Sequence, residues 1–161
     1  MTAIKFYRIA NKLYLKHIPI LPKFFYRMIY LLNNCHVHFA TKIGSGTIIA
    51  YGGIGVVIHK DAVIGMNCVI ESNVTIGGRN NDNNVPVIGN CVFIGTGARI
   101  LGNVRVGDNC IIGANSVVLH NIPDNCSVAG VPARILHEDI NIYEKCNIYQ
   151  IINHVDESTS H

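Results

Sequence analysis

An aliphatic residue recurs every six positions through the middle of this chain, and this period constrains the fold more than any other feature. The recurring residues are Ile58, Ile64, Ile70, Ile76, Ile88, Ile94, Ile100, Val106, Ile112 and Val118. An amphipathic α-helix places apolar residues three and four apart, and an amphipathic strand alternates them, so neither explains a sustained period of six. A solenoid of short strands, each closed by a turn, does explain it.

Three six-residue units complete one triangular coil, so residues 18 positions apart are expected to stack on one another. The sequence then predicts three internal ladders, namely Ile58, Ile76, Ile94 and Ile112; Ile70, Ile88 and Val106; and Ile64, Ile100 and Val118. A glycine follows the aliphatic residue at positions 65, 77, 89, 95, 107 and 113, which suits a tight corner where a Cβ atom would crowd the backbone. We therefore expect a mainly β fold.

The repeat is interrupted twice. Ile49 and Ile58 are nine positions apart, so about three extra residues are expected between them. The stretch GGRNNDNNVPV after Ile76 is polar and puts Asp82 where an aliphatic residue is due. This composition predicts a loop over residues 78–87 that leaves the coil. Because insertions in solenoids gather on the binding face, the loop indicates where a site is expected.

The remaining sequence divides the chain into three parts. Residues 1–40 are predicted to form a short, basic, helical N-terminal segment, and residues 41–134 the solenoid domain. Residues 135–161 leave the repeat and are predicted to form a C-terminal cap and tail, since a solenoid needs its ends covered.

The N-terminal segment carries only positive charge. Two amphipathic helices are predicted over 2–16 and 22–32, separated by prolines. Residues 1–32 contain no Asp or Glu, and their basic residues are Lys5, Arg8, Lys12, Lys16, Lys23 and Arg27. Such a segment is suited to peripheral contact with a membrane surface or with another anionic partner. A solvated helix face is the alternative.

Composition argues against several other classes of protein. Apolar residues make up 49% of the chain and charged residues 14%, and no apolar run is long enough to span a bilayer, so a cytoplasmic location is predicted. The six cysteines form no CxxC pair and no zinc spacing, so we expect reduced structural thiols and no metal site. Because the basic residues gather in the N-terminal segment and no binding motif occurs, no nucleic-acid partner is predicted.

Four stretches of the repeat carry a resemblance to a known family. They are VTIGG (74–78), IGTGARILG (94–102), IGANSVVL (112–119) and AGVPAR (129–134). In order and spacing, the segment from Ile43 to Arg134 resembles the serine O-acetyltransferase group of the hexapeptide-repeat acyltransferases. The resemblance implies a left-handed parallel β-helix, a homotrimer, and acetyl-CoA bound in the groove between neighbouring subunits.

The resemblance also implies which residues contact the acetyl donor. The matching positions are Gly78, Thr96, Arg99, Ala114, Gly130, Val131, Pro132, Ala133 and Arg134. Small residues let an extended pantetheine arm lie on the backbone, and the arginines offer charge to phosphate groups. For the small residues, turn geometry alone is the alternative.

The chain departs from the family where the catalytic base is expected. An alcohol is a poor nucleophile at neutral pH, so a base such as histidine must take its proton. The serine enzymes carry Asp-His-Ala-Thr-Gly in this coil, whereas the aligned residues here are YGGIG, with Gly52 at the histidine position. The segment RNNDNNVPV also lacks the histidine that the family carries in its loop.

We predict that His59 is the general base instead. His59 stands where the repeat prefers glycine, and by the 18-residue spacing it stacks with Gly77 and Gly95, which leaves open space toward the polar loop. Either Asp61 or Asp82 would orient its imidazole. A structural role for His59 in a turn is the alternative.

Two other histidines stay open as the base. His36 and His38 lead into the first coil, and a neighbouring subunit would bring one of them to the site.

The predicted function is an acetyl-CoA-dependent O-acetyltransferase that transfers acetyl directly to an acceptor hydroxyl in a ternary complex. The resemblance favours serine as the acceptor. A sugar hydroxyl in surface-polysaccharide assembly is one alternative, because the N-terminal segment is short and basic. A catalytically silent scaffold is another, because the family histidine is missing at Gly52.

Overall fold

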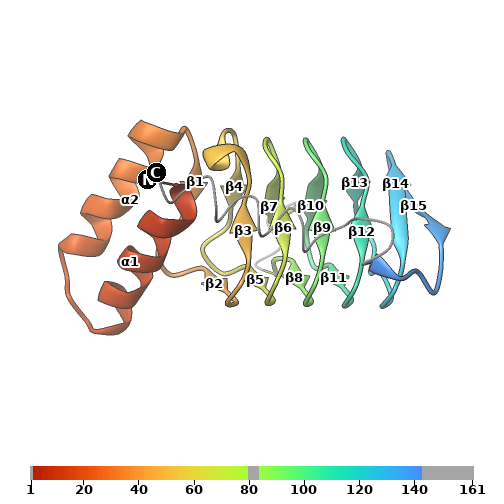
Figure 1. Ribbon diagram of the computed structural model, residues 1–161, viewed down its shortest axis with the longest axis horizontal. Helices are drawn as coiled ribbons and strands as arrows, with labels where there is room; N and C mark the ends of the chain where they lie inside the picture. The colour runs from red at the N-terminus through yellow and green to blue at the C-terminus, as the bar shows by residue number, and fades with distance from the viewer. Residues whose placement is uncertain (1, 80–83, 143–161) are drawn as a thin grey trace.

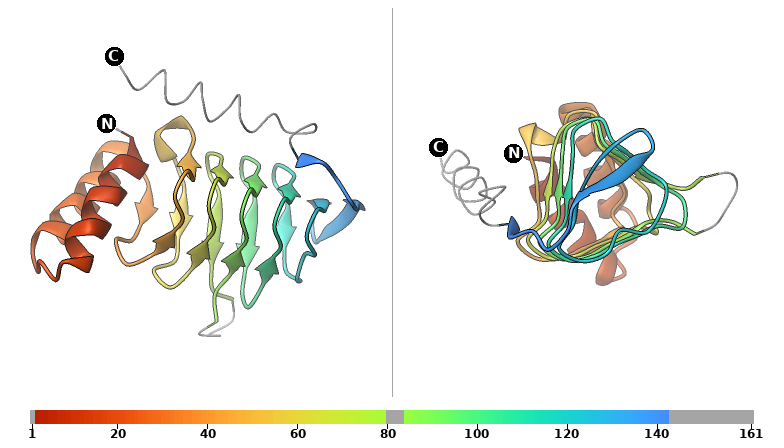
Figure 2. Two further views of the ribbon diagram at one scale, coloured as in Figure 1. Left: turned by 60° about the horizontal axis from the view of Figure 1, so that its bottom comes forward. Right: turned by 90° about the vertical axis from the view of Figure 1, so that its right-hand side faces the viewer.

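The computed structural model describes residues 2–79 and 84–142 and consists of a helical hairpin followed by a solenoid (Figure 1). Helices α1 (Ala3–Leu15) and α2 (Leu21–Asn33) form one end of the molecule. The solenoid is three-sided when viewed along its axis (Figure 2). The predicted left-handed parallel β-helix is confirmed.

Each side of the solenoid is one sheet of very short strands. Sheet A contains β1 (His36–Val37), β4 (Val57–Ile58), β7 (Thr75–Gly77), β10 (Arg99–Leu101) and β13 (Val117–Val118). Sheet B contains β2 (Lys42–Ile43), β5 (Val63–Ile64), β8 (Val87–Ile88) and β11 (Arg105–Val106). Sheet C contains β3 (Ile48–Ile49), β6 (Val69–Ile70), β9 (Phe93–Ile94), β12 (Ile111–Ile112), β14 (Ser127–Gly130) and β15 (Ala133–His137).

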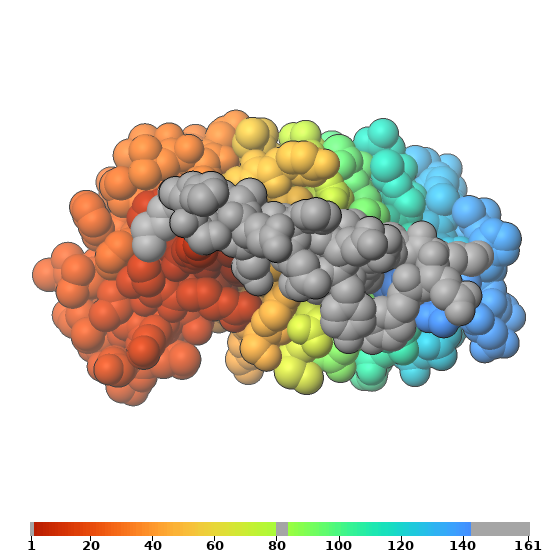
Figure 3. Space-filling view, viewed as in Figure 1, coloured from red at the N-terminus to blue at the C-terminus, as the bar shows by residue number. Residues whose placement is uncertain are grey.

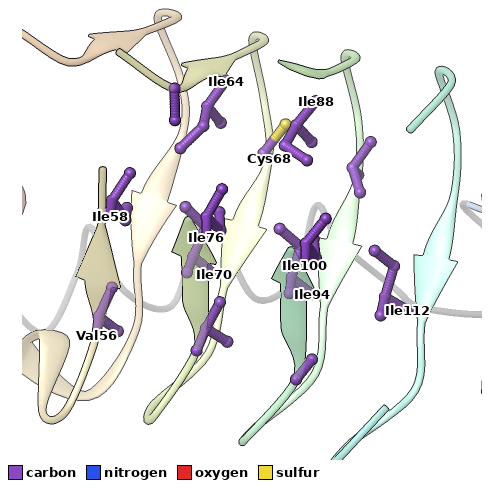
Figure 4. Close-up of a cluster of buried hydrophobic side chains, with 14 of the residues drawn as sticks. Val56, Ile58, Ile64, Cys68, Ile70, Ile76, Ile88, Ile94, Ile100 and Ile112 are labelled. Atoms are coloured by element: carbon purple, nitrogen blue, oxygen red, sulfur yellow. The ribbon is translucent and has the colours of Figure 1, made fainter. Parts of the chain in front are cut away.

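The recurring aliphatic residues all point inward and form the core (Figure 4). Ile58, Ile76 and Ile100 of sheet A, for example, are completely buried. The preceding residue in each strand points outward, since side chains alternate across a strand, and Val57 is therefore 42% exposed. The predicted period is thus the period of the core.

The predicted ladders are partly wrong, because the coil that contains the loop is longer than 18 residues. Ile58 pairs with Ile76, 18 positions on, but Ile76 pairs with Ile100, which is 24 positions on. Ile94 lies instead on Ile70 in sheet C.

The other two ladders are corrected in the same way. Ile88 lies on Ile64 in sheet B, not on Ile70, and Ile64 does not lie on Ile100. The steps Ile94–Ile112, Ile88–Val106 and Ile100–Val118 are as predicted. The insertion after β7 adds six residues, which is the length of one repeat. The period of six therefore continues after the insertion, but every later residue lies one side of the triangle away from the side that an uninterrupted 18-residue spacing predicts.

The first interruption is a short 3₁₀ helix. Helix η1 (Tyr51–Gly53) lies between β3 and β4, and the first coil is 21 residues long, because Val37 pairs with Ile58. This confirms the three extra residues. The two insertions leave the coil at different corners, η1 between sheets C and A and the loop between sheets A and B.

Glycines at the corner between sheets B and C have no room for a side chain. A Cβ atom on Gly65 would lie 2.3 Å from the carbonyl oxygen of Gly89, whereas one on Gly77, at the corner between sheets A and B, would meet no atom of the described residues within 4 Å. We expect Gly65→Ala to destabilise the protein by about 1–3 kcal/mol, because backbone must move, and Gly77→Ala to change stability by less than about 0.5 kcal/mol. Urea unfolding of both variants measures the difference, and equal losses would contradict it.

Helix α1 covers the open end of the first coil. The Arg8 guanidinium donates to the carbonyl oxygen of Ile43 at 2.6 Å and also to that of Gly44, and the Asn11 amide donates to Phe39 O at 2.8 Å. These bonds satisfy carbonyl groups that no further coil could pair with. The Arg8 guanidinium therefore has a structural role in closing the first coil.

The other end is closed by a hairpin. Strand β15 runs antiparallel to β14 after a turn that contains the cis Val131–Pro132 bond. Residues 143–161 of the predicted tail lie outside the described residues, as does Asp82 of the loop.

Cys35, Cys68, Cys110 and Cys126 are free thiols, and Cys146 lies outside the described residues. Cys35, Cys68 and Cys110 are buried. Burial raises the pKa of Cys35 to about 12 and the pKa values of Cys68 and Cys110 to about 11, so these side chains stay protonated and pack as small apolar groups.

Candidate active site

A pocket of about 280 Å³ lies where sheet A turns toward sheet B, and three histidines line it. Its lining consists of His36, His38, Val57, Ile58, His59, Lys60, Thr75, Ile76 and Gly77. The pocket lies against the end of β7, where the chain leaves the coil for the loop. The pocket therefore lies close to the insertion in the sequence.

The β-helix register explains why the histidines meet. Because Val37 pairs with Ile58 and Ile58 with Ile76, the residues that follow them, His38, His59 and Gly77, form one row. His36 joins this group from the outward face of β1. The prediction that His59 stacks with Gly77 is confirmed, and that with Gly95 is wrong, since Leu101 follows Gly77 in register. Among residues 2–79 and 84–142, no atom lies within 4 Å of the position that a Cβ atom on Gly77 would take.

His59 has a carboxylate partner in Asp61. The Asp61 backbone N–H donates to Nδ1 of His59 at 3.2 Å, and Oδ2 of Asp61 lies 3.7 Å from the same nitrogen. Because Nδ1 accepts the Asp61 N–H, the ring proton of neutral His59 lies on Nε2 in this geometry; moving that proton to Nδ1, where it would face the carboxylate, would leave a lone pair on Nε2. In the second tautomer the imidazole can accept a proton from a bound molecule. The side chain is 40% exposed, so solutes can reach it.

His38 is held in a neutral form. Its Nδ1 accepts a hydrogen bond from the Ala40 backbone N–H at 3.1 Å. Burial lowers the pKa of His38, and the positive charges of His36 and Lys60 lower it further, against an opposing effect of Asp61. Because Nδ1 accepts, the ring proton of neutral His38 lies on Nε2, which is then a hydrogen-bond donor.

Tyr26 of α2 completes the group, and nothing in the sequence indicated it. Its hydroxyl forms a hydrogen bond with Nε2 of His36, and its ring lies 5.3 Å from the rings of both His36 and His38 in edge-on geometry. The helical hairpin thus holds the two histidines of the first coil. Both come from the same chain as His59, and no neighbouring subunit is needed to bring them there.

Three of the positions matched to the donor site lie on the other edge of sheet A. Thr96, Ala114 and Gly130 follow the corner between sheets C and A on successive coils, and all three are exposed. The Asn115 N–H donates to Thr96 O at 2.8 Å, and the Gly130 N–H donates to the Ser116 hydroxyl at 3.3 Å. Together they form an exposed ledge of small residues.

The other matched positions lie around this ledge and at the pocket. Arg99 is exposed on sheet A, and its guanidinium donates to Gly97 O at 2.9 Å. Val131, Pro132 and Arg134 are exposed in and after the β14–β15 turn, while Ala133 is buried. Gly78 lies at the opposite edge, directly after Gly77 of the histidine pocket.

The family's histidine position is not adjacent to His59. Gly52 lies in η1 with a φ of 70°, at the corner between sheets C and A, and its neighbour Tyr51 is 69% exposed. Glu71 lies at the same corner one coil further on, and burial raises its pKa. Its Oε2 atom lies 3.5 Å from the hydroxyl of Thr96, which lies at this corner on the following coil. Sheet A therefore separates Gly52 from the histidine pocket within one chain.

No metal site accompanies these groups. Within residues 2–79 and 84–142, no three His, Cys, Asp or Glu side chains are arranged to hold a metal ion. No helix in these two ranges is long and apolar enough to cross a membrane.

Comparison with known sequences relates the chain to transferases. Residues 86–120 match the bacterial transferase hexapeptide (six repeats) family. The chain is 36% identical over 137 residues to a serine acetyltransferase of Synechococcus elongatus, covering 84% of this chain and 56% of that protein. It is 37% identical over 139 residues to the serine acetyltransferase of Haemophilus influenzae, covering 85% and 52%. The chain thus spans about half the length of these relatives.

Solved structures give the same result. Serine acetyltransferase from Vibrio cholerae superposes with a TM-score of 0.79 at 37% identity, over 86% of this chain and 54% of that one. Serine acetyltransferase from Brucella abortus in complex with coenzyme A superposes with a TM-score of 0.78 at 37% identity, over 84% and 55%. A further serine acetyltransferase match, with a TM-score of 0.77, is a complex with cysteine.

Proposed function

Because this chain is a serine acetyltransferase-like member of the hexapeptide-repeat acyltransferase superfamily, we propose that it transfers acetyl from acetyl-CoA to a small acceptor hydroxyl. The histidine pocket carries the proposal, since it supplies a carboxylate-oriented imidazole beside open space. A catalytically silent scaffold protein would not require an imidazole oriented by a carboxylate.

The proposed chemistry needs one base and one hydrogen-bond donor. His59 removes the proton from the acceptor hydroxyl while the hydroxyl oxygen attacks the thioester carbonyl carbon, and Asp61 stabilises the imidazolium. The new C–O bond replaces the C–S bond, and His59 returns the proton to the departing sulfur. In the same pocket, Nε2–H of His38 would donate a hydrogen bond to the thioester carbonyl oxygen, which gains negative charge during the attack. The products are an acetyl ester and coenzyme A.

The exposed ledge suits the acetyl donor. Thr96, Ala114 and Gly130 present backbone with little side-chain cover, so an extended arm can lie against them. Arg99 and Arg134 are exposed nearby, and the Arg99 guanidinium donates to Gly97 O through one of its five N–H groups, so both arginines offer charge to phosphate groups. Val131, Pro132 and Ala133 shape the turn beyond the ledge.

The placement of the two groups supports a trimer. The donor ledge and the histidine pocket lie on opposite edges of sheet A, so one subunit does not bring them together around one acetyl group. A homotrimer with parallel solenoid axes would place the ledge of one subunit against the pocket of its neighbour. The groove between subunits would then contain the complete site, including Gly78.

Serine is the first acceptor to test, because the relatives are serine acetyltransferases. A sugar hydroxyl is the second candidate acceptor, because this chain differs from the serine enzymes at two positions. Where the serine enzymes carry Asp-His, this chain has Tyr51 and Gly52, and the Tyr51 ring is 69% exposed. An exposed aromatic ring offers a flat apolar surface to the face of a sugar.

The decisive experiment follows loss of the thioester absorbance when purified protein is mixed with acetyl-CoA and single acceptors. This signal does not depend on the protein's own thiols. We expect turnover with serine or with one class of sugar, and no turnover above the hydrolysis rate without acceptor. If no member of a panel of amino acids and sugars is acetylated while the protein still binds coenzyme A, the scaffold function would be supported instead.

Filling the pocket tests its role without removing a catalytic group. Gly77→Leu places a side chain in the space beside His59, where Gly77→Ala adds one methyl group. We expect Gly77→Leu to lower kcat/KM by about 100-fold, because the acceptor can no longer approach the imidazole, and Gly77→Ala to lower it far less. Steady-state kinetics with the identified acceptor measure both, and equal activity of the two variants would move the site elsewhere.

A further inference from the structure

The outer face of α2 is apolar and basic, although it faces away from the protein core. Ile20, Phe24, Arg27 and Leu31 follow one another at spacings of four, three and four, so they share one face of the helix. Ile20 is 77% exposed, Phe24 56% and Leu31 74%. Ile29 and Pro22, on the opposite face, are buried.

The turn between the helices extends this surface. Leu15, at the end of α1, is 66% exposed, and Lys16 and Lys23 are exposed on either side of the turn. We refer to the set Leu15, Lys16, Ile20, Lys23, Phe24, Arg27 and Leu31 as the hairpin surface. It belongs to helices α1 and α2 and the turn between them, and these helices lie at the end of the molecule opposite β14 and β15, as Figures 1 and 3 show.

The charge of this region is unusually one-sided. The first acidic residue in the whole sequence is Asp61. Arg8 is committed to carbonyl groups of the first coil, but Lys5, Lys12, Lys16, Lys23 and Arg27 remain exposed. Within the described part of the chain, none of these five cations forms an ion pair with a carboxylate, and the observed ion pairs are those of Asp61.

Charge decides which occupant the hairpin surface fits. A second copy meeting the same surface would oppose cations to cations with no carboxylate between them, which costs free energy. A nucleic acid would satisfy the cations but would leave Phe24 and Leu31 exposed. An anionic lipid surface satisfies both, because apolar side chains enter the boundary below the headgroups while Lys and Arg contact phosphates.

We propose that the hairpin surface binds the surface of an anionic membrane. In the proposed trimer with parallel axes, three hairpin surfaces would lie at one end and bind together, so weak single contacts add up to stable attachment. The histidine pocket and the donor ledge lie on the solenoid. Attachment would therefore leave the site accessible, and it does not depend on the proposed activity.

Vesicle sedimentation of the full chain tests this proposal. Vesicles of phosphatidylcholine alone are compared with vesicles that also contain phosphatidylglycerol. We expect binding to the anionic vesicles only, and release as the salt concentration rises. The double variant Lys23→Gln/Arg27→Gln should weaken binding by about 25-fold, since each cation near an anionic surface contributes about fivefold.

The apolar part is tested by Phe24→Ser/Leu31→Ser, which should also reduce binding at least tenfold. The matched control is Arg105→Gln/Val87→Ser, which removes an exposed cation and an exposed apolar residue from sheet B. It should bind as the unaltered protein does, and circular dichroism checks that every variant is folded.

Three results would overturn the proposal. The first is that the unaltered protein binds neither kind of vesicle. The second is that the control variant loses as much vesicle binding as the hairpin variants. The third is that light scattering gives a lower oligomer mass for Phe24→Ser/Leu31→Ser, while the unaltered protein does not bind vesicles. The last result would assign the surface to a second copy of the chain. All three readouts are independent of acetyl transfer, so failure here and failure of the proposed function are distinguishable.

Discussion

Replacing His59 with alanine should lower kcat by about 10²–10⁴-fold with little change in stability. Loss of a general base typically has an effect of this size, because the acceptor hydroxyl must then give its proton to water. The side chain is 40% exposed, and its observed hydrogen bond, from the Asp61 N–H to Nδ1, joins two residues of the same turn, so the fold should persist. Initial rates from the thioester assay, with folding checked by thermal unfolding, measure the effect.

Two comparisons show whether the loss is specific to His59. His120→Ala removes an exposed histidine from a later coil and should leave kcat unchanged. Asp61→Asn keeps the size of the side chain but removes the carboxylate 3.7 Å from Nδ1, so kcat should fall by less than in His59→Ala. If His59→Ala keeps activity within a few-fold, His59 is not the base, and His36 or His38 of the same pocket becomes the candidate.

Ile88→Ala should destabilise the protein by about 2–5 kcal/mol, the largest stability change we expect from a single side-chain truncation. Ile88 is 2% exposed and lies between Ile64 and Val106 in the sheet B ladder, so its removal leaves a cavity between coils that cannot slide together. Urea unfolding monitored by circular dichroism gives the change in free energy.

The matched control is in the same strand. Val87 precedes Ile88 but points outward and is 42% exposed, so Val87→Ala should change the unfolding free energy by less than about 0.5 kcal/mol. Both variants should keep the far-ultraviolet spectrum of the native protein. Similar losses in the two variants would mean that the inward and outward assignment in this strand is wrong.

The sequence predicted the core well but not the vertical neighbours of each residue. Period six identifies which side chains point inward, because each coil repeats the same turn geometry. It cannot identify which coil a residue belongs to when an insertion has the length of one repeat. Ile94 therefore lies on Ile70 and not on Ile76, and only the register of the sheet reveals it.

The candidate site was predicted in part for a related reason. His59 was recognisable because a histidine stood where glycine was expected, and Asp61 was one of two candidates to orient it. The contributions of His38 and Tyr26 could not be predicted, because they depend on strand pairing and on how α2 packs against the first coil. Contacts between distant segments leave no local pattern in the sequence.

The insertion between Gly77 and Val87 has a practical consequence for engineering. Since it extends from one corner and matches the length of a repeat, exchanging it for a three-residue connection, like the one between β10 and β11, would return that coil to the spacing of its neighbours. Every inward side chain would keep its orientation and its partners above and below. Segments of other lengths can be grafted at the same corner, so selectivity of the adjoining pocket can be redesigned while the supporting framework stays constant.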